Sequence, residues 1–328
     1  MTAWYHSCLV LLTACPGCIT LLHMRLLQGL VAAAHTPTHE DGRLHPEAIT
    51  KQADLYASAG LQGVFVCGST GEALSFTKNE RIKILETWCP AAKSNDLLSI
   101  IHVGGACQSE AIDISQAANS ADADVVAAMA PPFIPPASID DLVDFLAPIA
   151  KAAGDRPFLF YDNPARSHVD FAPGMVLTAL KHAIPNFAGV KLTRSDLEAT
   201  EAAIDACGED AQVFFAADEM LLFALQLGIE AAIGASYNHS AGLFRRMMKA
   251  HQDGDMAAAT AEHDRAVVMI DVLYDKGIIP AGKAMMSVVG IDCGPPRPPL
   301  KALTPQAFAE VSNAMEALGL PDMSPAAT

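Results

Sequence analysis

Lys191 stands near the end of an apolar run, FAGVKLT (187–193). Burying a charged ammonium group costs on the order of several kcal/mol, so such a lysine must be paired, reach solvent from the strand end, or be neutral. A neutral amine is a nucleophile that can bond covalently to a carbonyl carbon. The run alone leaves these three alternatives open.

Other chemically capable side chains also follow apolar runs. They are the turn Ser69-Thr70-Gly71-Glu72, then Tyr161, Thr193, the pair Asp218-Glu219 and the segment Ser236-Tyr237-Asn238. A carboxylate ligand needs donors without a competing negative charge, and a hydroxyl and glycine turn supplies them. A tyrosine can relay a proton. Whether these groups act together with Lys191 depends on the elements that carry them.

Eight apolar runs, separated by Gly, Pro or polar residues, recur along the chain. They are 29–37, 63–69, 97–104, 123–132, 157–164, 187–193, 212–219 and 231–238. Each is continuously hydrophobic rather than alternating, which is typical of strands that are covered on both faces. Helices are predicted between them by three helix-start patterns, Thr77-x-x-Glu80, Ser138-x-x-Asp141 and Ser195-x-x-Glu198.

The starts of successive runs lie roughly 19 to 34 residues apart, which fits βα units. Eight such units close into a (β/α)8 TIM barrel, predicted here for residues 29–240, with residues 241–328 forming C-terminal helices packed on it. A doubly wound open sheet is the alternative, although no G-x-G-x-x-G follows the first run. Active sites of barrels lie at the C-terminal strand ends, so the side chains above are predicted to meet at one mouth. Polar rims that merely face solvent would show no such selection.

Residues 1–28 form an N-terminal extension whose nature stays open. LTAC (12–15) resembles a lipoprotein cleavage box and CPGC (15–18) has redox-motif spacing, but neither has its usual sequence context. We favour a natural start at Met24. The alternative is a cleaved or anchored signal peptide.

Composition narrows the class of protein. Hydrophobic residues make up 51% of the 328 residues and charged residues 18%, which is enough for a large core. The net charge is −16 without any basic run, which argues against a nucleic-acid partner. Beyond the first eighteen residues the cysteines are scattered, as in proteins of a reducing cytoplasm, and no stable membrane association is expected.

Histidine spacing gives no metal site. His35 and His39 are four residues apart, but Pro37 lies between them, so they do not share a helix face. No carboxylate is placed beside them by the sequence, and no metal is therefore predicted.

Four segments carry a family resemblance. They are GSTGEALSFT (68–77), YDNP (161–164), GVKLT (189–193) and ADEMLLFALQLGIEAAIGASYN (217–238). Together they resemble the dihydrodipicolinate synthase/N-acetylneuraminate lyase superfamily of class I pyruvate aldolases, and most closely its lyase branch. The resemblance runs from about residue 29 to the C-terminal helices. It implies an eight-stranded barrel with a C-terminal helical extension, a homotetramer, a 2-keto acid substrate, and neither metal nor organic cofactor.

The resemblance implies a role for each matching position. Lys191 would form a Schiff base with the keto carbon of an open-chain 2-keto acid, and Tyr161 would relay protons at the C4 hydroxyl. Ser69 and Thr70 would bind the substrate carboxylate. Sugar hydroxyls would be bound by Thr193, Asp218 and Glu219. Glu72 would support the turn that carries Ser69 and Thr70. Phe187, Val190 and Leu192 are predicted to form an apolar wall around the Lys191 amine. Such a wall would lower the pKa of this amine.

Some positions depart from the lyase pattern. Arg166 lies where synthases place an arginine that grips a second carboxylate, and Asp162-Asn163 replaces His-Ile. Ile134 lies where many members offer a second tyrosine from a neighbouring subunit. Alanines replace residues that often shape the sugar site, at Ala216, Ala217 and Ala235.

The predicted function is cleavage of N-acetylneuraminate, a sialic acid, to pyruvate and N-acetylmannosamine. The alternatives of the same chemistry are 4-hydroxy-tetrahydrodipicolinate synthase and other 2-keto-acid aldolases or dehydratases, which Arg166 keeps open. The synthase usually follows its lysine with Glu-Ala, whereas this chain has Leu192 and Thr193. A non-catalytic binding protein on the same scaffold is a further alternative, against which the presence of both Lys191 and Tyr161 argues.

Overall fold

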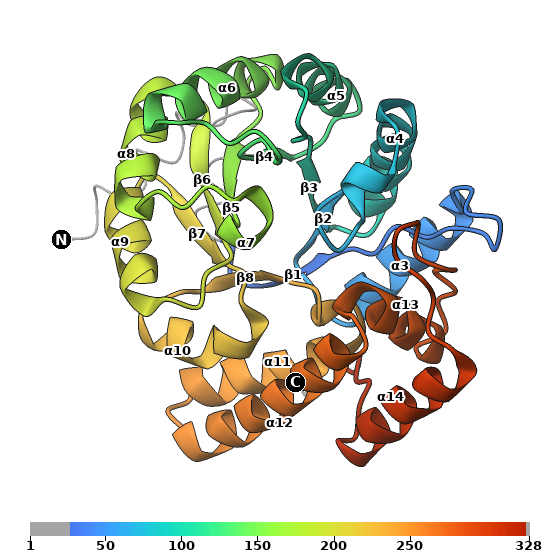
Figure 1. Cartoon of the computed structure of the whole chain (residues 1–328). Helices are drawn as coiled ribbons and strands as arrows, with labels where there is room; N and C mark the ends of the chain where they lie inside the picture. The colour runs from blue at the N-terminus through green and yellow to red at the C-terminus, as the bar shows by residue number, and fades with distance from the viewer. Residues whose placement is uncertain (1–26, 326–328) are drawn as a thin grey trace.

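Eight parallel strands close into one barrel in the computed structural model, which describes residues 27–325 (Figure 1). Each strand pairs with the next along the chain, and β8 pairs with β1. The strands are β1 (Gly29–Ala33), β2 (Gly63–Val66), β3 (Leu98–His102), β4 (Val125–Met129), β5 (Phe158–Asp162), β6 (Phe187–Leu192), β7 (Gln212–Phe215) and β8 (Ala231–Gly234). The predicted TIM barrel is confirmed and the open doubly wound sheet is wrong.

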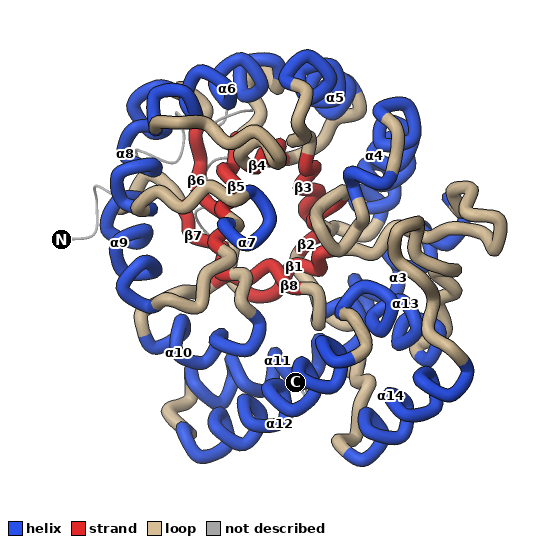
Figure 2. The backbone as a smooth tube through the Cα atoms, viewed as in Figure 1, coloured by secondary structure: helices blue, strands red, loops and turns tan. Residues whose placement is uncertain are grey.

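Helices surround the ring of strands, as Figure 2 shows. Those of the barrel are α3 (Pro46–Ser58), α4 (Lys78–Ser94), α5 (Gln108–Ser120), α6 (Ile139–Ala152), α7 (Pro164–Ser167), α8 (Pro173–Ala183), α9 (Leu197–Cys207) and α10 (Leu221–Gln226). Two short 3-10 segments follow β2 and β7, namely η1 (Ala73–Ser75) and η2 (Asp218–Met220). The C-terminal helices gather on one side of the barrel in Figure 1; they are α11 (Tyr237–Gln252), α12 (Met256–Asp275), α13 (Ile278–Val288) and α14 (Pro305–Ala317).

Strand side chains divide between two hydrophobic cores. One core fills the inside of the barrel and includes Phe65, Tyr161 and Phe214. The other lies between the strands and the helices, and includes Val190 and Leu192 of β6. Because both faces of every strand are covered, nothing along a strand needs to be polar. This explains why the strands read as continuous apolar runs.

Side-chain caps set the helix starts, and one prediction about them is wrong by a residue. Thr77 and Glu80 form a reciprocal capping box at α4, and the Ser138 hydroxyl accepts from the backbone N–H of Asp141 at α6. For α9, however, the cap is Asp196 rather than Ser195, because the Asp196 carboxylate accepts from two backbone N–H groups of the first turn. A carboxylate at this position also complements the positive end of the helix.

The predicted boundary at residue 240 falls inside α11. This helix begins at Tyr237, and Ser240 interrupts it with non-helical φ and ψ angles of −139° and 32°.

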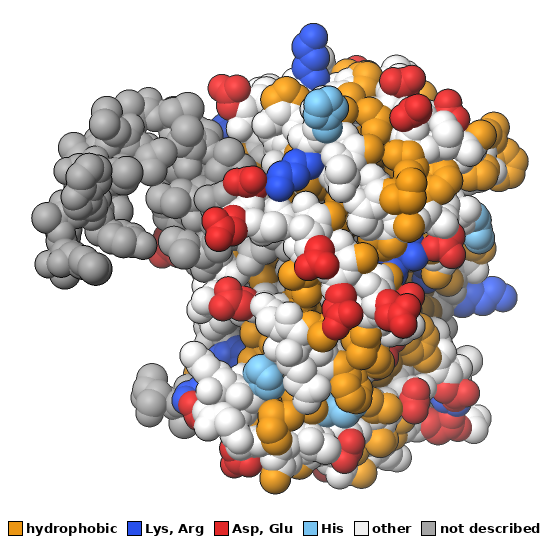
Figure 3. Space-filling model, turned by 90° about the vertical axis from the view of Figure 1, so that its left-hand side faces the viewer, with side chains coloured by type: hydrophobic (Ala, Val, Ile, Leu, Met, Phe, Trp, Pro, Cys, Tyr) orange, Lys and Arg blue, Asp and Glu red, His pale blue; other side chains and the backbone are white. Residues whose placement is uncertain are grey.

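The predictions about an N-terminal leader or a start at Met24 fall on residues 1–26, which lie outside the described range. Among the described residues, no helix combines the length and the apolar character that a membrane span requires. Figure 3 shows acidic side chains scattered singly over one face of the molecule.

Candidate active site

The C-terminal ends of the strands surround a cavity of about 290 Å³. All eight residues predicted for the site line it: Ser69, Thr70, Tyr161, Arg166, Lys191, Thr193, Asp218 and Glu219. They come from four strands or from the loops that follow them, which are far apart in the sequence. The barrel therefore brings the predicted groups to one mouth.

Lys191 and Tyr161 lie side by side inside the barrel, because the register of β5 and β6 pairs their Cα positions directly. The Lys191 side chain is buried, with its Nζ 3.9 Å from the ring centroid of Phe65 and 4.2 Å from that of Tyr161. Among residues 27–325, no acidic side chain forms an ion pair with this amine. Burial lowers the pKa of Lys191 below its ordinary 10.5, although interaction with Tyr161 opposes the shift.

The predicted apolar wall around Lys191 is wrong. Phe187, Val190 and Leu192 belong to the outer core, on the helix side of β6. Successive side chains of a strand point to opposite faces, so the immediate neighbours of Lys191 cannot surround its amine. Aromatic rings from two other strands surround it instead, Phe65 of β2 and Tyr161 of β5.

The Tyr161 hydroxyl is part of a short polar chain. It lies 3.3 Å from the Ser69 hydroxyl, and it accepts a hydrogen bond from the Asn163 amide at 3.0 Å. Burial opposes ionisation of this phenol. Its pKa nevertheless lies below 10, because the Lys191 charge and the hydrogen bonds with Ser69 and Asn163 favour the phenolate. Sequence reasoning did not place Asn163 in the site; the departure from the family pattern at YDNP was the signal.

The ends of β5 and β6 are clamped together outside the cavity. The Arg194 guanidinium donates to both carboxylate oxygens of Asp162, at 2.5 and 3.3 Å. It also pairs with Asp170 at 2.6 Å. Asp162 follows Tyr161, so this clamp holds the strand end that carries the phenol against the one that carries Lys191.

The turn after β2 is stabilised by contacts with the loop after β1 and with the C-terminal part of the chain. The Thr36 hydroxyl donates to the carbonyl oxygen of Gly71 at 2.7 Å. Glu72 adopts a left-handed conformation, with φ 55°, and its carboxylate pairs with the buried Lys283 amine at 2.8 Å. The same carboxylate accepts the backbone N–H of Arg297 at 2.7 Å. The hydroxyls of Ser69 and Thr70 thus stand on a turn that the C-terminal part of the chain fixes.

Asp218 lines the cavity, and its carboxylate is held from several sides. One of its oxygens accepts the backbone N–H of Ser236 at 2.9 Å, whereas Oδ1 is buried beside Gly234 and the ring of Tyr237, whose hydroxyl also interacts with this carboxylate. Burial raises the pKa of this carboxyl. The Thr193 hydroxyl interacts with the Tyr161 phenol and favours its ionised form. A Cβ at Gly234 would lie 2.1 Å from Asp218 Oδ1, so only glycine leaves room for this carboxylate.

The end of β8 contributes less to the cavity than the sequence indicated. Ser236 lines it, but Tyr237 and Asn238 do not. Both are buried behind it, and the Asn238 amide donates to the backbone oxygen of Ala33 at 2.7 Å. These two residues fix the closing strands of the barrel.

Arg166 stands at the opening of the cavity, on the exposed helix α7. It also lines an adjoining cavity of about 480 Å³, which shares Ser69 and Tyr274 with the first. A guanidinium at this place can reach a carboxylate on the distal part of a ligand. Sequence reasoning missed Tyr274, which comes from α12, because only tertiary packing brings the C-terminal helices to the mouth.

Comparison with known proteins gives consistent matches. The model of the Dihydrodipicolinate synthetase family matches residues 26–318. N-acetylneuraminate lyase of Rattus norvegicus is 33% identical over 296 residues, which cover 89% of this chain and 92% of that protein. The corresponding lyase of Homo sapiens is 34% identical over 295 residues, with 89% and 91% covered. The solved N-acetylneuraminate lyase of Aliivibrio salmonicida superimposes with a TM-score of 0.87 at 32% identity, over 91% of this chain and 99% of the other.

Proposed function

The chain belongs to the dihydrodipicolinate synthetase family and is a lyase of the class I aldolase type, and from this premise we propose that it cleaves N-acetylneuraminate to pyruvate and N-acetylmannosamine. The observation that carries the proposed chemistry is the buried Lys191 amine, which lies beside the Tyr161 phenol and has no ion pair among the described residues. The similarity to lyases named for N-acetylneuraminate supports this choice of substrate.

The first step is formation of an imine. The neutral Lys191 amine attacks the C2 keto carbon of the open-chain sugar acid, and the carbinolamine loses water to give a protonated imine. This cation accepts the electrons of the breaking carbon–carbon bond far better than a ketone does. Burial supports the step because it favours the unprotonated amine.

The second step is cleavage of the C3–C4 bond. Tyr161 takes the proton of the C4 hydroxyl, the C4 oxygen becomes the aldehyde of N-acetylmannosamine, and the bonding electrons pass to the imine as an enamine. Tyr161 then returns a proton to C3, and water hydrolyses the imine to release pyruvate and the free Lys191 amine. At this step the protonated imine carries the positive charge at Lys191 Nζ. That charge and the bonds from Ser69 and Asn163 lower the phenol pKa, which suits Tyr161 to this exchange.

The remaining lining residues bind the substrate. Ser69 and Thr70 are proposed to hold the carboxylate next to the keto carbon, since they present hydroxyl and backbone donors on a fixed turn. Thr193 and Asp218, which line the cavity, are proposed to bond hydroxyls of the sugar chain. Glu219, beside Asp218, would serve the same purpose.

A borohydride trapping experiment tests the imine. Reduction in the presence of pyruvate should add the mass of the reduced pyruvate adduct to the wild-type chain, and the Lys191→Met variant should show none. Intact-mass spectrometry reads both results. The absence of any adduct on the folded wild type would favour a non-catalytic binding protein.

A second candidate substrate class is an acceptor with two carboxylates, as in the synthase reaction. The position of Arg166 at the cavity mouth favours it. For a sialic acid, Arg166→Ala should change kcat/KM by less than about fivefold, the worth of an exposed charge pair of about 1 kcal/mol. Assays that follow pyruvate release or consumption with sialic acids, other keto-deoxy sugar acids and doubly acidic acceptors decide between the classes. A steep loss limited to doubly acidic acceptors would support the synthase-like function.

The reaction is also proposed to need no metal or organic cofactor, because the imine itself supplies the electron sink. Full activity after exhaustive dialysis against EDTA is the expected result. A loss of kcat without any fall in Tm, which zinc or magnesium restores, would contradict this proposal.

A homotetramer is proposed from the family and from exposed apolar side chains. Phe133 is 90% exposed and Ile134 75% exposed, on the loop after β4. Light scattering during size exclusion should give about four times the mass of one chain, and a monomer would contradict it.

A reducing cytoplasm is the proposed compartment, since the cysteines described by the structure are all free thiols: Cys67, Cys89, Cys107, Cys207 and Cys293.

A further inference from the structure

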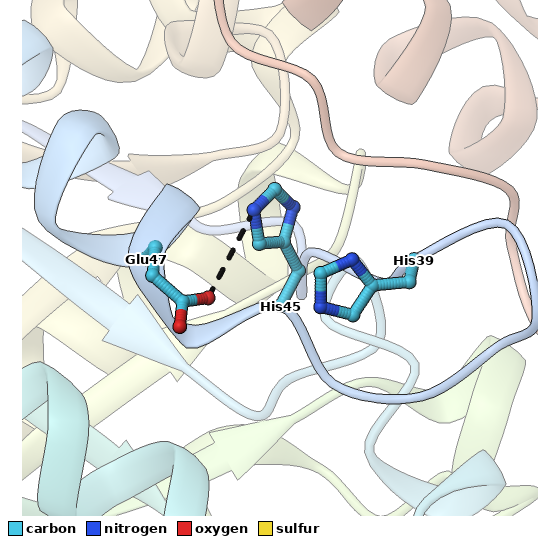
Figure 4. A group of neighbouring side chains, drawn as sticks. All are labelled: His39, His45 and Glu47. Carbon is cyan, nitrogen blue, oxygen red and sulfur yellow. Dashed lines mark ion pairs between the residues drawn. The ribbon is translucent and has the colours of Figure 1, made fainter.

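The loop between β1 and α3 folds back on itself as a short hairpin (residues 38–45), whose two arms bring two histidines together. Thr38 and Leu44 form an antiparallel bridge, and the His39 N–H donates to the carbonyl oxygen of Arg43 at 2.8 Å. His39 and His45 therefore lie beside each other although five residues separate them in the sequence. Figure 4 shows the two imidazoles with Glu47, which belongs to the first turn of α3.

The three side chains have the spacing of a ligand set. The imidazole centroids are 4.3 Å apart, and Glu47 Oε2 lies 3.9 Å from His45 Nε2. One nitrogen or oxygen of each residue lies within 4.8 Å of the corresponding atom of the other two. Within residues 27–325, no hydrogen bond engages the imidazole nitrogens of His39 or His45. Their lone pairs are therefore open to a ligand.

Two imidazoles and one carboxylate suit a particular class of ion. Zinc is bound in proteins by His nitrogen at about 2.0–2.1 Å and by carboxylate oxygen at about 2.0–2.2 Å, and two His with one Glu is a known three-ligand set. An ion between the three groups requires the side chains to close by small rotations, which their partial exposure permits. Magnesium and calcium prefer oxygen ligands, so this set disfavours them.

We propose that His39, His45 and Glu47 bind a divalent transition-metal ion of the zinc type, with the fourth position filled by water. This site is separate from the aldolase chemistry, because none of the three residues lines the Lys191 cavity. The ion would join both arms of the hairpin to the start of α3. It would stabilise the folded chain by mass action, since the unfolded chain does not hold the three groups together.

The hairpin is also connected to the turn that carries Ser69 and Thr70. The carbonyl oxygen of Gly42, at its tip, accepts two hydrogen bonds from the Arg297 guanidinium, at 3.1 and 2.8 Å. The backbone N–H of the same Arg297 donates to Glu72. An ion that fixes the hairpin therefore fixes a segment in direct contact with the support of that turn.

The sequence analysis did not bring these three residues together, for a specific reason. It considered His39 only with His35, which lies earlier on the same side of the loop. In the structure the neighbour of His39 is His45, which comes from the returning arm and which a linear pattern does not reveal. His35 itself is buried against α13, where a Cβ at Gly282 would come within 2.5 Å of its Nε2.

The test uses the full chain without a polyhistidine tag, stripped with EDTA, and titrated calorimetrically with zinc chloride. The chain contains other histidines and eight cysteines, so variants decide the assignment. His45→Ala and Glu47→Gln should each weaken or remove one equivalent of bound zinc. His182→Ala, which changes an exposed histidine of α8 outside the cluster, should bind as the wild type does.

Two further measurements complete the test. Zinc should raise the Tm of the wild type and of His182→Ala, and it should raise that of His45→Ala less. Cobalt bound in place of zinc should give visible absorption bands typical of nitrogen and oxygen ligands without a thiolate band. If the double variant His39→Ala/His45→Ala binds as much zinc as the wild type with the same affinity, the proposal is wrong.

Discussion

Two lysines of this molecule are buried to nearly the same degree, yet their surroundings differ. Lys191 is 4% exposed and Lys283 3%. The Lys283 amine lies 2.8 Å from the Glu72 carboxylate and donates to the carbonyl oxygen of Pro295 at 3.0 Å. The Lys191 amine has aromatic rings around it and no ion pair among the described residues.

The difference teaches that burial alone does not identify a nucleophile. A carboxylate partner keeps a buried ammonium charged, and the pair then serves as a tie between two segments. The faces of aromatic rings attract a cation much less than a carboxylate does, so the amine among them can give up its proton. The role proposed for Lys191 rests on the lack of such an ion pair among the described residues.

The largest effect should separate the two lysines directly. Lys191→Met should remove catalysis, which means the loss of about 10⁶-fold or more in turnover, because no imine can form. Lys283→Met should still form the imine in whatever fraction of the chain is folded. Pyruvate release and borohydride trapping on both variants give the comparison. An adduct that survives in Lys191→Met and disappears in folded Lys283→Met would reverse the assignment.

The next effect concerns the group beside the unpaired lysine. Tyr161→Phe should slow turnover by about 10² to 10⁴-fold, as expected for the loss of a proton relay. The imine should still form with pyruvate, because the Lys191 amine and its burial remain. Steady-state kinetics and borohydride trapping measure the two properties separately. Unchanged turnover would show that another group moves the proton.

A third effect is on stability and concerns the paired lysine. Lys283→Met leaves the Glu72 carboxylate buried without its partner, which should cost about 3 to 5 kcal/mol of the free energy of unfolding. The double variant Lys283→Met/Glu72→Gln should recover part of this loss, because the uncompensated charge is gone. Lys191→Met should cost little or increase stability. Urea unfolding of the four chains gives the comparison, and equal losses in both lysine variants would contradict it.

The smallest effect is the dependence on pH. Because burial lowers the pKa of Lys191 below 10.5, the unfolded chain binds more protons at this residue between the lowered pKa and 10.5. The contribution of Lys191 to the free energy of unfolding therefore rises with pH in that window. This pH dependence should be absent from the Lys191→Met variant. The imine should form faster as pH rises through the lowered pKa, by at most about tenfold per pH unit. The rate should level off above the lowered pKa, and a rate that keeps rising up to about 10.5 would show that the pKa of Lys191 is not lowered.

The architecture could be predicted from the sequence, and so could those lining residues of the cavity that stand at or just after strand ends. Strands covered on both sides must be apolar throughout, and the end of each strand places its polar residues at a common edge. These two rules brought Lys191, Tyr161 and Asp218 to one place without knowledge of a single contact. The spacing of the runs supplied the closure into a barrel.

What the sequence could not give depends on contacts between distant segments. The ring of Phe65 near Lys191 comes from another strand, and the partner of Glu72 comes from α13. Ser195 and Asp196 are both good helix caps, so composition does not decide between them. The alternation of side chains along β6 excludes Val190 and Leu192 from the wall around the amine, so this feature depends on strand geometry alone and not on distant contacts.

Glu72 supports the turn that carries Ser69 through its contacts with Lys283 and Arg297. These contacts also determine when the turn becomes fully supported during synthesis of the chain. Glu72 and Arg297 are separated by 225 positions, and the hydrogen bond between them forms across that whole length. All eight strands leave the ribosome before Lys283 and Arg297 do. A nascent chain can therefore complete its barrel while the loop between its second strand and α4 still lacks its final support. The turn that carries Ser69 and Thr70 therefore gains its final support only near the end of translation.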